Sequence, residues 1–210
     1  PPAYDAPPAP PLPLPDDGIG ADAALTLFEQ RYVPGMAASS GPRYWGLVTG
    51  GTTPAALLGD WLTASFDTNL ADRHNSAAPQ IELDAIRLLL DLFRLPQTLH
   101  GVFVSGATAA NLVGLAMGRE WVNRQRGHDT AQDGLYATPP VRLLSAEPHS
   151  TIYKAMSILG MGRRHVQRVA RLPGNREAID VTDLERQLAA LNGEPVIVSA
   201  SAGTVNTVDF

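Results

Sequence analysis

The sequence predicts an α/β fold in which helices flank a mostly parallel sheet. Short apolar stretches, each expected as a strand, alternate with longer stretches whose apolar residues recur at helical spacing. One strand is expected to begin at Val102, and three more are expected over residues 141–146, 166–170 and 195–200. Such alternation favours parallel pairing. Small and hydroxyl-bearing residues also follow three of these strands, at the sheet edge where open α/β folds bind ligands.

Composition narrows the class of protein further. Hydrophobic residues make up 44% of the chain, which is ample for a buried core. A net charge of −5 with scattered arginines argues against a nucleic-acid partner. The chain has no cysteine, so disulfides and thiolate sites are excluded, and we expect no metal centre. Because we find neither a membrane-span-like run nor a signal-peptide pattern, we expect a cytoplasmic protein that does not enter a membrane.

Residues 1–80 are expected to form an arm with helices. Half of residues 1–16 are proline, so this segment should run extended, either as a flexible tail or as an arm laid over a neighbouring subunit. Apolar spacing predicts a helix over residues 22–32, and a second helix should begin at Pro54, a favoured first position. Residues 81–210 are expected to form the main domain.

A glycine-rich loop precedes that second helix. Thr49 to Thr53 (TGGTT) follows the aromatic pair Tyr44 and Trp45. Such a loop could line a ligand pocket, or its two glycines could simply permit a turn.

Four further helices are expected in the main domain. The first carries an apolar stripe that marks a core-facing side rather than a cofactor site. The last has Asp180 as a plausible cap and Gly193 as its stop. The four helices are expected over residues 82–95, 108–124, 151–160 and 180–192, and residues 126–140 are expected to form a polar loop.

The stretch Val102 to Asn111 (VFVSGATAAN) offers the first candidate site. Its apolar strand should turn through Ser105, Gly106 and Ala107 and open a helix at Thr108. The first amides of a helix have no intrahelical partner, and the helix dipole adds positive potential, so this turn suits a phosphate. An ordinary strand–turn–helix corner would have the same appearance. Two other strand ends, His149–Thr151 and Gly203–Thr204, favour the phosphate-bearing ligand, because all three should share one sheet edge.

Four ordered motifs then resemble a known family. They are GPRYWGLVTGGTTPAALLGDWL, SGATAAN, PHSTIYKA and IVSASAGTVNTVDF. In this order they are similar to the pyridoxal-phosphate-dependent group II amino acid decarboxylases, which include aromatic-amino-acid and glutamate decarboxylases. The resemblance implies a fold type I, PLP-dependent transferase-like domain that is incomplete in these residues, an amino acid substrate, and a homodimer whose arm is exchanged between subunits.

The resemblance also implies roles for individual residues. Ala107 and Thr108 match the pair that cradles the cofactor phosphate, and Thr204 matches a hydroxyl residue near the cofactor. His149 matches the histidine that stacks on the pyridine ring, where it could also transfer a proton during catalysis. The loop that holds Thr49 and Gly50 matches a stretch of the substrate pocket.

Two features depart from the family pattern. Ala109 stands where the family commonly has an acidic residue. The only lysine, Lys154, does not match the Schiff-base lysine, and Asp209 does not match the ring-nitrogen aspartate, since the family has both further downstream. We therefore expect these residues to be the N-terminal portion of a PLP-dependent carboxy-lyase that is inactive without its C-terminal part. The alternatives are another fold type I enzyme, such as a lyase or an aminotransferase, and a non-catalytic remnant or partner subunit without the lysine.

Overall fold

The structure of the chain is a computed structural model. It describes residues 10–44, 46, 51–68, 74, 76–136, 138–174, 176–205, 207 and 209. The chain divides into two compact units, Pro1–Thr68 and Asn69–Phe210, and each unit is described by itself. The division expected from the sequence at residue 80 falls inside helix α3 of the second unit (Ala78–Leu92).

The first unit consists of helices with much exposed apolar surface. It contains α1 (Ala21–Arg31), the short 3₁₀ helix η1 (Val33–Gly35) and α2 (Pro54–Phe66). Pro54 opens α2 as the sequence predicts, and the Thr53 hydroxyl caps it by accepting from the N–H of Ala56 at 3.2 Å. Every residue of α2 is exposed, including Trp61 at 62% and Phe66 at 73%. This helix therefore has an apolar surface that its own unit does not bury.

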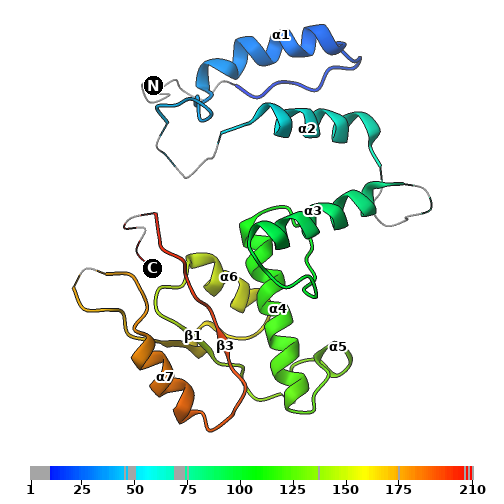
Figure 1. The fold of residues 1–210 in the computed structure, drawn as a ribbon. Coiled ribbons are helices and arrows are strands. Elements are labelled where there is room, and N and C mark those ends of the chain that lie inside the picture. The colour runs from blue at the N-terminus through cyan, green and yellow to red at the C-terminus, as the bar shows by residue number, and fades with distance from the viewer. Residues whose placement is uncertain are drawn as a thin grey trace. The chain divides into compact units, whose positions relative to one another are not determined.

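The second unit is built on a parallel sheet of three strands in the order β2–β1–β3 (Figure 1). The strands are short: β1 (Leu143–Ser145), β2 (Val166–Arg168) and β3 (Ile197–Val198). Leu143 of the central strand pairs with Val166 on one side and Ile197 on the other. The helices of this unit are α3, α4 (Ala107–Gln125), α5 (Thr130–Asp133), α6 (Ser150–Ile158), the 3₁₀ helix η2 (Arg163–His165) and α7 (Val181–Ala190).

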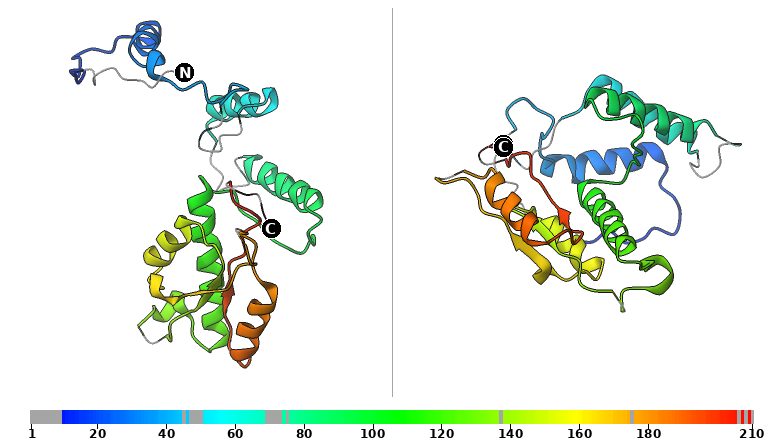
Figure 2. Two further views of the ribbon diagram at one scale, coloured as in Figure 1. Left: turned by 90° about the vertical axis from the view of Figure 1, so that its left-hand side faces the viewer. Right: turned by 60° about the horizontal axis from the view of Figure 1, so that its bottom comes forward.

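Helices cover both faces of this sheet (Figure 2). Leu143 is fully buried and belongs to a core cluster with residues of α4 and α6, such as Leu115 and Met156. Its neighbour Leu144 points to the other face and belongs to a cluster that packs against Leu184 of α7. Successive side chains of a strand face opposite sides, so a central strand buried on both faces reads as continuously apolar. The predicted α/β class with a helix-flanked parallel sheet is confirmed.

One predicted strand is wrong. Residues 101–104 form no strand, and Val102 is 61% exposed. The backbone N–H of Phe103 donates instead to Glu82 Oε1 of α3 at 2.9 Å, so a side chain takes the place that a strand partner would have. The expected polar loop of residues 126–140 contains α5, which Asp129 caps through the N–H groups of Ala131 and Gln132. In the described part of the chain, no helix is long and apolar enough to cross a membrane.

Candidate functional site

The carboxyl edge of the sheet brings two of the expected strand ends together. The Ser145 hydroxyl, at the end of β1, donates to the carbonyl oxygen of Ser199 at 2.7 Å. Further along, the Ser201 hydroxyl donates to the carbonyl oxygen of Glu147 at 3.0 Å. The segment that follows β3 therefore runs beside the segment that leads from β1 to His149. This is the edge where parallel sheets bind ligands.

The start of α4 presents amide groups to solvent. Gly106 is its N-cap, and no side chain of the described residues caps it. The first backbone bond of the helix runs from the N–H of Ala110 to the carbonyl oxygen of Gly106 at 3.0 Å, so the amides of Ala107, Thr108 and Ala109 precede the hydrogen-bonded ladder. Ala107 and Thr108 are exposed, and a Cβ built on Gly106 would meet no atom within 4 Å. The turn therefore has the donors and the room that a phosphate needs.

His149 lies at the start of α6 and is tied to α4. Its Nδ1 accepts from the backbone N–H of Thr151 at 3.2 Å and lies 2.8 Å from the Thr151 hydroxyl. The Asn111 side-chain amide donates to that same hydroxyl oxygen at 2.7 Å. Asn111 lies one helical turn after Thr108, on the same side of α4. Hydrogen bonds thus connect Asn111, one turn beyond Thr108 in α4, with His149.

Thr204, the fourth cofactor residue expected from the sequence, lies in a different set of contacts. Its hydroxyl donates to Glu177 Oε2, which also accepts from Thr207 at 2.6 Å. Glu177 belongs to the loop between β2 and α7. Thr49 and Gly50, expected in the substrate pocket, lie outside the described residues.

Asp209 anchors the chain after β3 and has a structural role. Its carboxylate accepts from the Arg176 guanidinium, with Nε at 2.9 and 3.0 Å from its two oxygens, and from the N–H groups of Glu177 and Ala178 at 3.1 Å. The hydrogen bond from Arg176 is the main reason that the pKa of Asp209 falls to about 2. Sequence reasoning missed Arg176 and Glu177, because nothing in their spacing points to residues 32 or 33 positions away.

Lys154 is exposed on α6, as expected of a surface residue. It borders an open hollow of about 610 Å³ together with Thr151 and Arg163. Among the described residues, no three histidine, aspartate or glutamate side chains gather closely enough to hold a metal ion.

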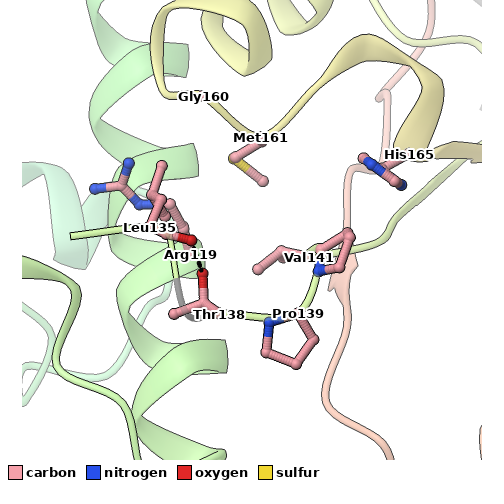
Figure 3. Close-up of a pocket in the computed structure, with 9 residues that line it drawn as sticks. Arg119, Leu135, Thr138, Pro139, Val141, Gly160, Met161 and His165 are labelled. Carbon is pink, nitrogen blue, oxygen red and sulfur yellow. Dashed lines mark hydrogen bonds between the residues drawn. The ribbon is translucent and has the colours of Figure 1, made fainter. Parts of the chain in front are cut away.

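A smaller cavity of about 120 Å³ lies at the amino end of β1. Figure 3 shows the residues that line it. Val141, which leads into β1, lines it together with Met161 and His165. Arg119 also lines it, but its Nη1 donates to the carbonyl oxygen of Leu159 at 2.9 Å and its Nη2 pairs with Glu120 at 2.8 Å. Because this cavity lies at the amino end of the strand and its cation is already engaged, it is a poor candidate for an anion site.

Comparison with known proteins identifies the family. Residues 9–210 match the pyridoxal-dependent decarboxylase conserved domain. L-2,4-diaminobutyrate decarboxylase of Acinetobacter baumannii is 32% identical over 120 residues, or 52% of this chain and 23% of that protein. Aromatic-L-amino-acid decarboxylase of Bacillus atrophaeus is 24% identical over 197 residues, or 92% of this chain and 38% of that protein.

Solved structures agree on the fold. Mouse CSAD in its apo form is 27% identical, with a TM-score of 0.71, and the match covers 91% of this chain and 40% of that one. Oryza sativa TDC with PLP and tryptamine has a TM-score of 0.77 over 99% of this chain and 45% of that one; at 20% identity this shows the fold alone. The chain spans less than half the length of these relatives. Since the family match takes in nearly the whole sequence, the chain belongs to the pyridoxal-dependent decarboxylases.

Proposed function

We propose that the chain is the N-terminal part of a PLP-dependent amino acid decarboxylase and holds one side of the cofactor site. The amides of Ala107, Thr108 and Ala109, with the Thr108 hydroxyl, bind the phosphate, and the imidazole of His149 stacks on the pyridine ring. The observation that carries this proposal is the hydrogen-bonded connection from Asn111 through Thr151 to His149. It links His149, the ring-stacking candidate, to the helix that begins at the proposed phosphate site, although Asn111 and His149 are 38 positions apart in the sequence.

The residues of this chain fit the demands of such a site. An exposed helix start offers several parallel N–H donors to a phosphate dianion, and the helix dipole adds to their attraction. The cofactor, when bound, supplies the electron sink that lets an amino acid lose its carboxylate as CO2. The chain's contribution is to bind the phosphate, to hold the ring in one plane against His149, and to place a titratable imidazole beside the reacting substrate.

We further propose that the covalent anchor for the cofactor comes from outside these 210 residues. Lys154 is the only amine side chain in the sequence, and it lies exposed five positions beyond His149. Asp209 is held by Arg176 and two backbone amides, so it is committed to anchoring its own segment. We expect these residues alone to bind the cofactor but not to decarboxylate amino acids.

Thr204 is a further residue of the proposed cofactor site, and Thr49 and Gly50 are proposed for the substrate pocket. Thr204 follows β3 at the same sheet edge as His149, and its hydroxyl would have to exchange Glu177 for the cofactor. Thr49 and Gly50 are assigned to the substrate pocket on the resemblance alone.

We propose a homodimer in which a second copy covers the first unit. The support is the exposure of α2, whose apolar side chains include Trp61 and Phe66. A patch of this kind is unusual on a soluble monomer and marks an interaction surface. Sedimentation at increasing protein concentration should show a monomer–dimer equilibrium that Trp61→Glu weakens.

A binding titration tests the cofactor proposal. Pyridoxine 5′-phosphate carries the phosphorylated pyridine but no aldehyde, so it cannot react with Lys154 or with the chain's amino terminus. Calorimetric titration should show saturable binding of this compound and much weaker binding of pyridoxine. Equal affinity for the two compounds would contradict a phosphate cradle at α4. In the completed enzyme, release of CO2 and an amine from an amino acid would support a decarboxylase, and a keto acid would indicate an aminotransferase.

A further inference from the structure

The hydrogen bonds at His149 have a fixed direction. The backbone N–H of Thr151 lies 3.2 Å from Nδ1 of the imidazole. A peptide N–H can only donate, so Nδ1 must accept, and a nitrogen that accepts carries no proton. The turn that starts α6 therefore selects the form of the ring in which Nδ1 is bare.

The orientations of the Thr151 hydroxyl and the Asn111 amide follow from the bare Nδ1. The Thr151 hydroxyl lies 2.8 Å from Nδ1, and because Nδ1 accepts, the hydroxyl must donate its only proton there. Its oxygen can then only accept from Asn111, whose side chain lies 2.7 Å away. The amide nitrogen of Asn111, rather than its oxygen, must therefore face Thr151. The backbone N–H of Thr151, at one end of this series of hydrogen bonds, therefore determines which group donates in each of them.

The geometry points to Asn111 and Thr151 as positioning residues that hold the neutral ring of His149 in the tautomer with its proton on Nε2. This inference deepens the proposed function, since it gains its meaning from His149 lying against a cofactor. An imidazole held in this form can donate a hydrogen bond through Nε2, but it cannot accept one there. The edge of His149 that points away from Thr151 would then serve as a donor to whatever lies beside it.

Nitrogen-15 NMR of the full chain can determine the tautomer of the His149 ring directly. Long-range proton–nitrogen spectra distinguish a bare ring nitrogen from a protonated one, and the signals of His149 among the five histidines are found by their loss in His149→Gln. At a pH where the ring is neutral, we expect a bare Nδ1 and a protonated Nε2, with no exchange between the two neutral forms. A mixture of both forms in the unmodified chain would overturn the inference without any variant.

Asn111→Asp should oppose the backbone N–H from the other end of the series. A carboxylate can only accept, so the Thr151 hydroxyl would turn toward it and offer Nδ1 a lone pair instead of a proton. We expect the ratio of Nδ1-protonated to Nε2-protonated neutral ring to rise about tenfold, the worth of one reversed hydrogen bond. Ser157→Ala removes another hydroxyl of α6, one that donates to the carbonyl oxygen of Tyr153, and should leave the His149 signals unchanged.

Thr151→Val in the Asn111→Asp background separates a hydrogen-bonded relay from simple attraction by the new charge. Loss of the Thr151 hydroxyl should abolish the rise in the Nδ1-protonated form of His149. Thr151→Ser in the same background should retain that rise. Persistence of the change in the valine variant would show that the carboxylate acts through space and would refute the relay. All of these spectra are recorded without any ligand. They can therefore contradict the inference about His149 while pyridoxine 5′-phosphate still binds, and binding can fail while the spectra agree with the inference.

Discussion

The Asn111 side chain donates a hydrogen bond of 2.7 Å to the Thr151 hydroxyl, across forty residues of sequence. One residue belongs to the first two turns of α4, and the other to the first turn of α6. The two helices pack together over the core that Leu115 and Met156 share. This bond therefore sets the relative position of two helix starts that face the same edge of the sheet.

Loss of this bond should lower stability. Thr151→Val keeps the shape of the side chain but leaves the half-buried amide of Asn111 without its acceptor. We expect the free energy of unfolding in urea to fall by about 1–3 kcal/mol, the cost of an unmet polar group in a partly buried place. Thr151→Ser keeps the hydroxyl and should recover most of the loss. An unchanged midpoint in Thr151→Val would show that this bond contributes nothing to stability.

Thr108→Ala should weaken binding of pyridoxine 5′-phosphate. A hydroxyl that donates to a phosphate contributes about 1.5–3 kcal/mol, so the dissociation constant should rise at least about tenfold. Thr182 is a matched control, because it is also exposed and is also the second residue of its helix. Calorimetric titration should show that Thr182→Ala binds like the unmodified chain. Equal losses in both variants would remove Thr108 from the site.

Core packing beneath the site should carry much of the stability of the second unit. Met156 is fully buried in the cluster that joins α4, α6 and β1. Met156→Ala should lower the free energy of unfolding by about 2–5 kcal/mol, through lost apolar contact and a residual cavity. Ile158 lies two residues further along and is exposed, so Ile158→Ala should have little effect in the same denaturation experiment.

The segment that follows β3 should detach at acid pH. The folded-state pKa of Asp209 is about 2, below the value of about 3.9 for an unperturbed aspartate. A carboxyl with a lowered pKa stabilises the fold at pH values above the unfolded pKa, and this contribution disappears as pH falls through the folded value. Hydrogen exchange at the N–H groups of Glu177 and Ala178 should therefore accelerate between about pH 4 and pH 2, beyond its intrinsic pH dependence.

Asp209→Asn provides the control for that experiment. Without a titrating carboxyl, the two amides should be weakly protected at neutral pH and should show no further step in the acid range. An acid step that survives in this variant would assign it to another group, such as Asp183, whose pKa is lowered by hydrogen bonds from the Ala170 N–H, Arg186 and Gln187.

Local patterns in the sequence predicted most of the elements. The stretch around Leu143 and Leu144 is apolar without alternation because both faces of β1 are covered, so its burial could be anticipated. Pro54 and Asp180 marked helix starts, because their chemistry suits a first position and a cap. The helix start near Thr108 was anticipated for a related reason, since small residues precede it in the sequence.

Relationships between distant residues could not be predicted. Nothing near Asn111 in the sequence indicates that Thr151 is its acceptor, and the bond of Thr204 to Glu177 depends on how the chain turns after β3. The strand expected at Val102 failed because three apolar residues in a row fit a strand only if a neighbouring strand pairs with them. There the amide of Phe103 has Glu82 as its partner instead.

Titration of the nitrogen-15-labelled chain with pyridoxine 5′-phosphate tests the central claim most directly. If the start of α4 and His149 form one site, the amide signals of Ala107, Thr108 and Ala109 and the ring signals of His149 should shift together and saturate with a single dissociation constant. Shifts confined to the cavity near Val141 and His165, or a His149 ring that does not respond while the α4 amides do, would contradict the claim.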